Sequence, residues 1–368
     1  MKVKITATEL KTVIEKAMAA APKKSSLSIL SRLYFIAKND QLTIFSSDME
    51  IFLNVKADAI IVEDGEFAVD IDDLKPFIKA KGDITLETGY CSVKIKSGTK
   101  AITVNTWSAE NRPNFRELGN RELIAEFNES WLYETLTKLV VYTAKEDNNK
   151  MLTVVNLNTK RQIVEAIDGH RIGFRNIPDD CIKNETETGD FLILNTSVPV
   201  FKKLLDKNGA EKVRVYEDKK YIFIEKTDRF TYAQRKLEGK FFDTKHFFAE
   251  NYEYSFDVDR KQLLNNINDI KDLMTAGDRK PVIYDIENEI KSSFANVKYK
   301  IEDEIPISNN TGSIRIGFNP NFIYDVCNTV GQETLHCFGT RPIDPMTIVA
   351  EEEGYRFIVL PVNIKNVA

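Results

Sequence analysis

The chain begins with a short phrase, Ile5-Thr6-Ala7-Thr8-Glu9-Leu10, that returns twice in altered form among its 368 residues. The later copies are Phe127-Asn128-Glu129-Ser130-Trp131-Leu132 and Val258-Asp259-Arg260-Lys261-Gln262-Leu263. Each copy places a threonine, asparagine or aspartate, whose side chain can cap a helix, directly after an apolar residue. Apolar residues then recur at helical spacing. Because the caps lie 122 and 131 residues apart, we predict three copies of one structural unit.

The rest of each unit follows one order: three strand-like runs, a second helix and three more strand-like runs. The runs are 33–37, 41–45, 51–55, 83–87, 92–96 and 101–106 in the first unit, 152–157, 162–166, 172–177, 212–216, 221–225 and 230–233 in the second, and 282–286, 289–294, 297–301, 333–338, 346–350 and 355–362 in the third. The second helices are predicted to start at Asp72, Thr196 and Asn319.

The composition is that of an ordinary globular chain, with 42% hydrophobic and 29% charged residues, which argues against disorder. No apolar run approaches the roughly 18 residues that a membrane span needs, and the N-terminus lacks the pattern of a signal peptide. We therefore expect a cytoplasmic protein with no membrane partner. The four cysteines form no CxxC pair and the three histidines have no metal-ligand spacing, so we expect reduced thiols, no metal and no cofactor.

Motifs of nucleotide-binding, metalloprotease and hydrolase sites are absent from the sequence. One cluster, Asp168-Gly169-His170-Arg171, has side chains that could perform acid and base chemistry. It occupies the position that Ser47-Asp48-Met49-Glu50 has in the first unit, between two predicted strands, and Asp-Gly is a common turn former. We therefore favour a turn that contributes to a binding surface over a catalytic site, and we assign no catalytic residue.

Lysines gather on the polar faces of the predicted helices, although the whole chain has a net charge of −5. A solvated helical surface is one interpretation of this pattern, since acidic side chains lie among the lysines. The other is a modestly basic lining inside an acidic protein, which would suit a protein that surrounds DNA without gripping it.

Seven phrases carry a resemblance to a known family, and they occur in its order and spacing along essentially the full length. They are Leu27-Ser28-Ile29-Leu30, Ser47-Asp48-Met49-Glu50, Arg112-Pro113-Asn114-Phe115, Ala166-Ile167-Asp168-Gly169-His170-Arg171, Leu237-Glu238-Gly239-Lys240-Phe241, Ile316-Gly317-Phe318-Asn319 and the ending Ile358-Val359-Leu360-Pro361-Val362. With them the chain resembles the bacterial sliding clamps, the beta subunits of DNA polymerase III holoenzyme.

The resemblance implies an α+β fold of three clamp-type domains, here 1–122, 123–249 and 250–368, of the DNA clamp fold. In the family two chains join head to tail as a homodimer, a closed six-domain ring that encircles duplex DNA without reading its sequence and confers processivity on the replicative polymerase. Such a protein is not an enzyme. Three expected DNA-binding lysines follow from the family's DNA-contacting loops, and five from the helical faces of this chain. They are Lys24, Lys145 and Lys150, and Lys75, Lys79, Lys138, Lys202 and Lys203.

The resemblance also implies a cleft for short peptides between the second and third domains. Its expected partners are the DNA polymerase III alpha subunit, the clamp loader and other proteins with a clamp-binding motif. The matching positions are Leu152, Ile167, Gly169, His170, Arg171, Ile172, Phe242, His246, Phe247, Pro345, Met346, Ile358, Val359, Leu360, Pro361 and Val362. Any one of the apolar positions could instead be a core residue.

Three departures from the family pattern concern this cleft. Phe242 stands where a proline is usual, His246 stands where an arginine is usual, and Asn363 to Ala368 extend past the customary end. The first two would change the floor of the cleft, and the third could cover its rim. An alternative function is a clamp-fold scaffold, such as a mobile-element paralogue, that binds proteins without being the replicative ring.

Overall fold

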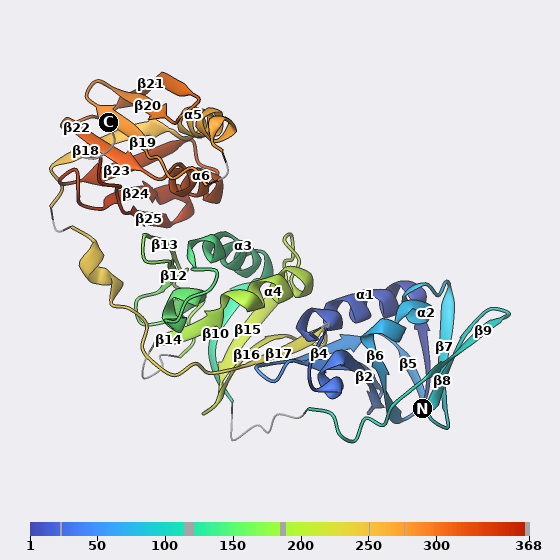
Figure 1. Ribbon diagram of the computed structural model, residues 1–368. Coiled ribbons are helices and arrows are strands. Elements are labelled where there is room, and N and C mark those ends of the chain that lie inside the picture. The colour runs from blue at the N-terminus through green and yellow to red at the C-terminus, as the bar shows by residue number, and fades with distance from the viewer. Residues whose placement is uncertain (23, 114–120, 185–188, 250, 276, 365–368) are drawn as a thin grey trace. The chain divides into compact units, whose positions relative to one another are not determined.

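The computed structural model describes residues 1–22, 24–113, 121–184, 189–249, 251–275 and 277–364 (Figure 1). The chain forms two compact units. Unit 1 comprises Met1–Glu134, Asp180–Thr186 and Thr196–Glu238, and unit 2 comprises Thr135–Asp179, Glu187–Asn195 and Gly239–Ala368. No helix among the described residues is long and apolar enough to cross a membrane.

Helices and strands follow the same order three times, apart from one additional strand, β5, in the first repeat, which confirms the predicted repeat and the α+β class. The first repeat contains β1 (Lys2–Thr6), α1 (Ala7–Ala17), β2 (Arg32–Lys38), β3 (Gln41–Ser47), β4 (Ile51–Ala57), β5 (Ile60–Glu63), β6 (Gly65–Asp70), α2 (Lys75–Ile78), β7 (Asp83–Gly89), β8 (Ser92–Ser97) and β9 (Lys100–Asn105). The second contains β10 (Glu122–Asn128), α3 (Glu129–Leu139), β11 (Val154–Asn158), β12 (Ile163–Ile167), β13 (Arg171–Asn176), β14 (Asp190–Leu194), α4 (Val198–Leu204), β15 (Lys212–Glu217), β16 (Tyr221–Lys226) and β17 (Phe230–Arg235). The third contains β18 (Tyr254–Asp259), α5 (Arg260–Leu273), β19 (Val282–Ile286), β20 (Glu289–Ala295), β21 (Lys300–Ser308), β22 (Ile314–Phe318), α6 (Pro320–Thr329), β23 (Thr334–Gly339), β24 (Met346–Ala350) and β25 (Tyr355–Val359).

Unit 1 holds a five-stranded sheet in the order β5-β1-β7-β8-β9 and an eight-stranded sheet in the order β10-β15-β16-β17-β4-β3-β2-β6. The larger sheet crosses from one repeat to the next because β17 pairs antiparallel with β4, from Phe230 opposite Val55 to Gln234 opposite Ile51. Helix α1 packs on β3 and β4 and also contacts α2 and α4 (Figure 1).

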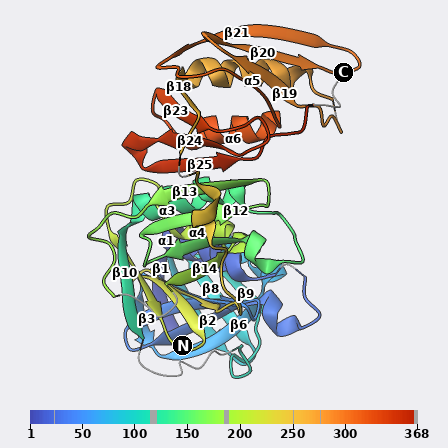
Figure 2. The same ribbon diagram turned by 90° about the vertical axis from the view of Figure 1, so that its left-hand side faces the viewer.

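Unit 2 holds one sheet of twelve strands, in the order β14-β11-β12-β13-β25-β24-β23-β18-β21-β20-β19-β22. It too crosses between repeats, since β13 pairs antiparallel with β25. Helices α5 and α6 contact each other, and Figure 2 shows both helices from a second direction. Their apolar faces are buried, and Ile267 of α5 and Val326 of α6 have no exposed surface. Both units therefore contain a joint between repeats that is a continuous antiparallel strand pair.

The predicted first helices begin where their caps require. The Thr6 side chain accepts a hydrogen bond from the Glu9 N–H at 3.2 Å, and the Asp259 side chain accepts one from the Gln262 N–H at 2.8 Å. Helix α3 begins directly after Asn128. These bonds satisfy N–H groups that have no partner within the helix.

The second helices match the prediction once and differ from it twice. Asn319 caps α6 as predicted, since its side chain accepts from the Asn321 N–H at 3.0 Å. The starts predicted at Asp72 and Thr196 are wrong, because a 3-10 turn occupies each position and α2 and α4 begin three and two residues later. In both helices a proline stands in the first turn, where its missing N–H needs no partner, and the regular helix forms around it.

Two predicted strands also differ from the structure. The run 297–301 is a turn followed by β21, because the Asn296 side chain accepts hydrogen bonds from the N–H groups of Lys298 and Tyr299. The last strand ends at Val359 and not at Val362. Beyond it the chain crosses to β22, where the Val362 N–H donates to the Gly317 carbonyl at 2.8 Å.

Candidate functional site

The Asp168-Gly169-His170-Arg171 segment is a tight turn between β12 and β13. One carboxylate oxygen of Asp168 accepts hydrogen bonds from the N–H groups of His170 at 2.9 Å and Arg171 at 3.0 Å. Gly169 has a φ of 87°, a left-handed conformation that favours glycine. The predicted turn is confirmed, and the Asp168 carboxylate stabilises it by accepting these two backbone hydrogen bonds.

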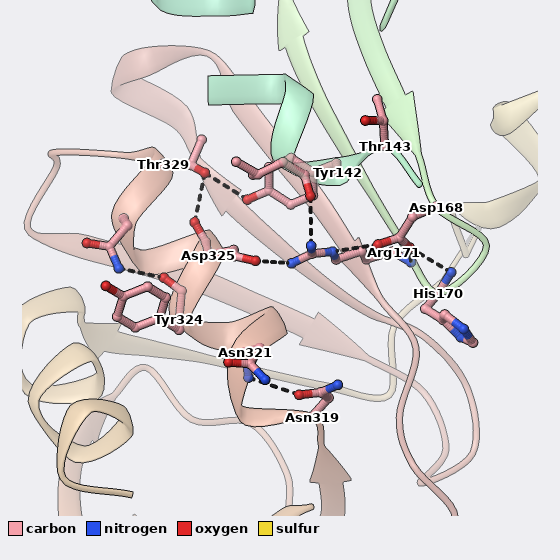
Figure 3. Close-up of polar contacts among 12 residues, drawn as sticks. Tyr142, Thr143, Asp168, His170, Arg171, Asn319, Asn321, Tyr324, Asp325 and Thr329 are labelled. Carbon is pink, nitrogen blue, oxygen red and sulfur yellow. Dashed lines mark hydrogen bonds and ion pairs between the residues drawn. The ribbon is translucent and has the colours of Figure 1, made fainter. Parts of the chain in front are cut away.

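Arg171 is a buried cation that connects the second repeat to the third. Its side chain is 8% exposed and donates from Nε to the Asp168 carboxylate at 2.9 Å, from one terminal nitrogen to the Asp325 carboxylate of α6 at 2.6 Å, and from the other to the Val141 carbonyl at 2.7 Å (Figure 3). Burial alone would lower the pKa of Arg171, but its bonds to Asp325 and Asp168 outweigh burial and raise it. Removing one partner would leave a buried charge without full compensation, so breaking this contact should strongly destabilise the fold.

Aromatic rings enclose the guanidinium group. It lies 5.1 Å from the centre of the Tyr142 ring and 4.6 Å from that of Phe322. The Tyr142 hydroxyl is 2.8 Å from the Thr329 hydroxyl of α6, and the exposed His170 ring stacks on Phe322 with 6.0 Å between centres. We call Tyr142, Asp168, His170, Arg171, Phe322 and Asp325 the joint cluster. Its geometry fixes α6 against β13, and Asp168 bonds to backbone of His170 and not to its ring, unlike an acid–base pair.

The structure divides the predicted cleft residues into two groups. The buried ones belong to the strand pair itself: Val359 lies opposite Arg171 on one side and opposite Met346 on the other. The buried members are Ile167, Arg171, Ile172, Met346, Ile358 and Val359, and the half-buried or exposed members are Leu152, Gly169, His170, Phe242, His246, Phe247, Pro345, Leu360, Pro361 and Val362. Only the second group offers surface to a partner, and all sixteen residues belong to unit 2.

The last exposed members follow the end of β25. The Leu360 N–H donates to the His170 carbonyl at 2.9 Å, which brings the chain end beside the Asp-Gly turn. Ile364 then lies against Gly317 of β22, where an added Cβ would come within 2.4 Å of its methyl group. The tail as far as Ile364 therefore follows β22, and the rest of the predicted extension, to Ala368, lies outside the described residues.

The segment between the second and third repeats carries three of the predicted residues. Phe242 is half-buried and packs edge-on against Phe241 with 5.5 Å between ring centres. The side chain of His246 is 85% exposed and lies 3.2 Å from the Asp243 carboxylate. Phe247 is 43% exposed. The side chains of His246 and Phe247 therefore extend into solvent, and other contacts must fix the segment that carries them.

Buried Glu165 holds this segment. The Thr244 hydroxyl donates to one Glu165 oxygen at 2.6 Å, and Arg161 and Asn156 donate to the carboxylate at 3.2 and 3.1 Å. Glu165 has no exposed surface, and burial raises its pKa despite the bonds from Thr244, Arg161 and Asn156. This network ties the segment that carries Phe242 and His246 to β12.

Sequence reasoning missed Tyr142, Phe322 and Asp325 as parts of this site. Phe322 lies on α6 directly before buried Ile323, and its ring meets His170 and Arg171. Asp325 stands 154 residues from Arg171, so no local pattern connects them.

The predicted DNA-binding lysines are exposed in seven of eight cases, all but Lys138. Those in unit 1 are Lys24, Lys75, Lys79, Lys202 and Lys203, and those in unit 2 are Lys138, Lys145 and Lys150. Lys138 lies 3.8 Å from the Glu353 carboxylate and 5.4 Å from the centre of the Tyr355 ring, so part of its charge is already compensated. The assignment of these residues to DNA binding stays a prediction.

Residues 1–116 match the family model described as DNA polymerase III beta subunit, N-terminal domain. A beta sliding clamp of Pseudomonas aeruginosa is 22% identical over 357 residues, which covers 93% of this chain and 94% of that protein. One from Staphylococcus aureus is 20% identical over 351 residues, which covers 89% and 90%.

Solved structures share the fold over the whole length. A putative DNA polymerase III beta subunit from Eubacterium rectale has a TM-score of 0.92 at 22% identity, with 100% of both chains covered. The DNA polymerase III beta subunit of Thermotoga maritima has a TM-score of 0.85 at 23% identity, with 98% of this chain and 99% of that chain covered. This chain is therefore similar in sequence over almost its whole length to beta sliding clamps, and it shares its fold with DNA polymerase III beta subunits.

Proposed function

We propose that two copies of this chain close head to tail into a ring of six domains that encircles duplex DNA. The ring serves as a non-catalytic processivity clamp for the replicative polymerase, and it acts in the cytoplasm. The domains of this proposal are 1–122, 123–249 and 250–368. Retention by topology needs only weak phosphate contacts, which permit sliding.

The observation that carries the proposal is the rule by which repeats join. The last strand of the second repeat, β17, pairs with β4 of the first, and the last strand of the third, β25, pairs with β13 of the second. The strands β4, β13 and β21 occupy the same place in the three repeats, and so do β9, β17 and β25. Applied once more, the rule pairs β9 with β21 of another copy.

In the part of the chain that the structure describes, β9 and the first part of β21 each have an edge along which no strand is paired. Among the described residues β9 pairs only with β8, and the first part of β21, Lys300 to Ile305, pairs only with β20. No residue of β9 is buried, whereas four of five are buried in β25. An open edge is a site for pairing with another chain, and a heterologous contact closes a ring when its rotation completes the circle.

The two edges carry opposite charge. Strands β8 and β9 contribute Lys94, Lys96 and Lys100 and no acidic residue, although Lys96 pairs with Glu87 of β7. Strand β21 exposes Glu302, Asp303 and Glu304, and its Lys300 pairs with Glu302 at 2.8 Å, which leaves the strand with net negative charge. Complementary charge favours this pairing and disfavours β9 with β9 or β21 with β21.

Partner peptides dock, in this proposal, on the exposed surface beside the joint cluster. Leu152, Phe242, Phe247, Pro345 and Leu360 supply apolar surface there, and His170 and His246 supply polar groups. Apolar anchors with a few polar groups are the composition of an interaction hot spot. The proposed partners are the polymerase III alpha subunit, the clamp loader and other proteins with a clamp-binding motif.

Retention on circular DNA tests the ring. Labelled protein is incubated with nicked plasmid, the clamp loader of its host and ATP, and is then separated by gel filtration. We expect the protein to elute with the plasmid and to be released when a restriction enzyme linearises it. A protein that binds its peptide partners but never remains on the circle would instead be a scaffold with the clamp fold.

A further inference from the structure

We propose that unit 1 contains a binding site for a phosphate-rich anion, in a pocket between α1 and α4 that we call the lysine pocket. The pocket has a volume of about 460 Å³. Its floor is apolar, with buried Val13, Val55 and Leu204, so it persists as a shaped hollow. Its rim is basic: Lys16, Lys56, Lys202, Lys203, Lys207, Lys226 and Arg229.

Three of these cations are neutralised by the protein. Lys226 lies 2.7 Å from the Glu129 carboxylate and 2.6 Å from that of Glu211. Lys56 lies 3.6 Å from Asp228, and Arg229 lies 2.8 Å from Asp58.

The carboxylates that line the pocket are engaged as well. Glu129 is 1% exposed and accepts from Lys226 and from the Asp206 N–H at 2.9 Å. Glu9 accepts from the Asp58 N–H at 3.1 Å, and Asp206 accepts from the Asn208 N–H at 2.9 Å. These carboxylates remain charged, and Glu129 and Glu9 raise the pKa of Lys16, but seven basic side chains line the pocket against three acidic ones.

Four lysines of the rim, Lys16, Lys202, Lys203 and Lys207, have no carboxylate within ion-pair distance in the part of the chain that the structure describes. Lys16 is the most constrained, since it is half-buried on α1 and faces Lys226. Burial, and then repulsion by Lys226, lowers the pKa of Lys16. An anion in the pocket would add a favourable charge that offsets this repulsion.

The chemistry of the rim selects phosphate groups. Lysine ammonium groups bind phosphate oxygens as mobile point charges, whereas a single carboxylate ligand is better matched by the planar fork of arginine. Lysines from two helices, α1 and α4, can each contact a different phosphate of one ligand. The shared chemistry is a chain of adjacent phosphates, which a free polyphosphate or nucleotide offers, and which the backbone of DNA offers at wider spacing.

Inorganic tripolyphosphate, titrated calorimetrically into the full-length protein without DNA or metal, tests the site. We expect saturable binding that the double substitution Lys16→Gln with Lys202→Gln weakens about tenfold or more. The matched control is Lys11→Gln on the same helix, because Lys11 is paired with Glu15 at 3.9 Å and does not line the pocket. It should change the affinity less than about twofold.

Absence of binding to the wild-type protein would overturn the site, as would equal binding to the double variant. A 20-base-pair duplex added to the saturated protein separates the two sources of phosphate. Displacement of tripolyphosphate assigns the pocket to DNA backbone, and its retention assigns the pocket to a free polyphosphate. The light-scattering mass of the double variant reports the ring separately, so failure of this site leaves the proposed ring untouched.

Discussion

The last strands of the first and third repeats, β9 and β25, occupy equivalent places but have opposite surroundings. Strand β25 lies between β13 and β24, and most of its residues are buried. Strand β9 pairs with β8 alone, among the described residues, and all its residues are at least partly exposed. The same position in the repeat therefore gives a core strand where the chain supplies a neighbour and an open edge where it does not. In the proposed ring, the missing neighbour of β9 is a second chain.

Substitution of the buried cation Arg171 should weaken the joint between β13 and β25. Arg171→Ala leaves the carboxylates of Asp168 and Asp325 without their cation and opens a cavity between two rings. We expect the free energy of unfolding of unit 2 to fall by about 3–5 kcal/mol. Urea titration followed by tyrosine fluorescence measures this.

The control for that variant is Arg315→Ala, which removes an exposed ion pair with Asp285 in the same unit. Its cost should stay near 0–1 kcal/mol. Similar losses in the two variants would show that the joint cluster does not hold the repeats together.

One acidic charge added to β9 should weaken its proposed pairing with β21. Ile102→Glu would place a carboxylate opposite the acidic edge of β21, and we expect the dimer dissociation constant to rise about a hundredfold, equivalent to about 2.7 kcal/mol. Light scattering across a dilution series measures it. Ile60→Glu makes the same change on β5, the other edge of the same sheet, where Ile60 is 67% exposed. If both variants dissociate alike, β9 is not the interface.

Glu165 holds the segment between the second and third repeats, and its contribution to the free energy of unfolding should depend on pH. The pKa of Glu165 is raised in the folded state, so its protonated form is favoured by folding. Its stabilising contribution is complete below the unfolded pKa of about 4.5 and is lost as pH rises through the folded pKa. Glu165→Gln should therefore gain stability relative to the wild type as pH rises over this interval.

Thermal unfolding of both proteins from pH 4 to pH 8 measures this difference. Thr244→Val, which removes a donor to the same carboxylate, should cost about 1–3 kcal/mol. A constant difference between Glu165→Gln and the wild type at every pH would contradict the role of Glu165.

The smallest expected effect concerns Phe242. If peptides bind in the proposed cleft, the Phe242 ring would compete with them for apolar contacts, so Phe242→Ala should tighten binding of a glutamine-containing, leucine-rich clamp-binding peptide, by less than about tenfold. Leu360→Ala should weaken the same peptide by about 1–3 kcal/mol, since it removes apolar surface. Calorimetric titration compares the three proteins, and equal affinities would mean that peptides bind elsewhere.

Much of this architecture could be predicted because it is local. The caps at Thr6 and Asp259, the alternating strands and the Asp-Gly turn all depend on neighbours within a few residues. The strand after Asn296 begins at Lys300 and not at Val297, because the Asn296 side chain accepts hydrogen bonds from the backbone N–H groups of Lys298 and Tyr299. Hydrophobic alternation does not reveal the turn that these bonds form.

The contacts that make the site could not be predicted, because they join distant segments. Arg171 donates a hydrogen bond to Asp325, which is 154 residues away in the sequence, and Thr244 donates one to Glu165, which is 79 residues away. The lysine pocket combines Lys16 of α1 with Lys202 of α4 in the same way. Composition could indicate basic helices, but only the packing of α1 on α4 shows which lysines share one hollow.

Hydrogen exchange at the β9 edge tests the proposed closure most directly. Amides of β9, β5 and β25 are followed by mass spectrometry at micromolar protein concentration, where β5 provides an open edge and β25 a covered strand within the same sample. We expect the outward amides of β9, and those of β21, to exchange as slowly as those of β25 and to accelerate on dilution. Exchange of β9 at the rate of β5 at every concentration would contradict a ring closed by these two strands.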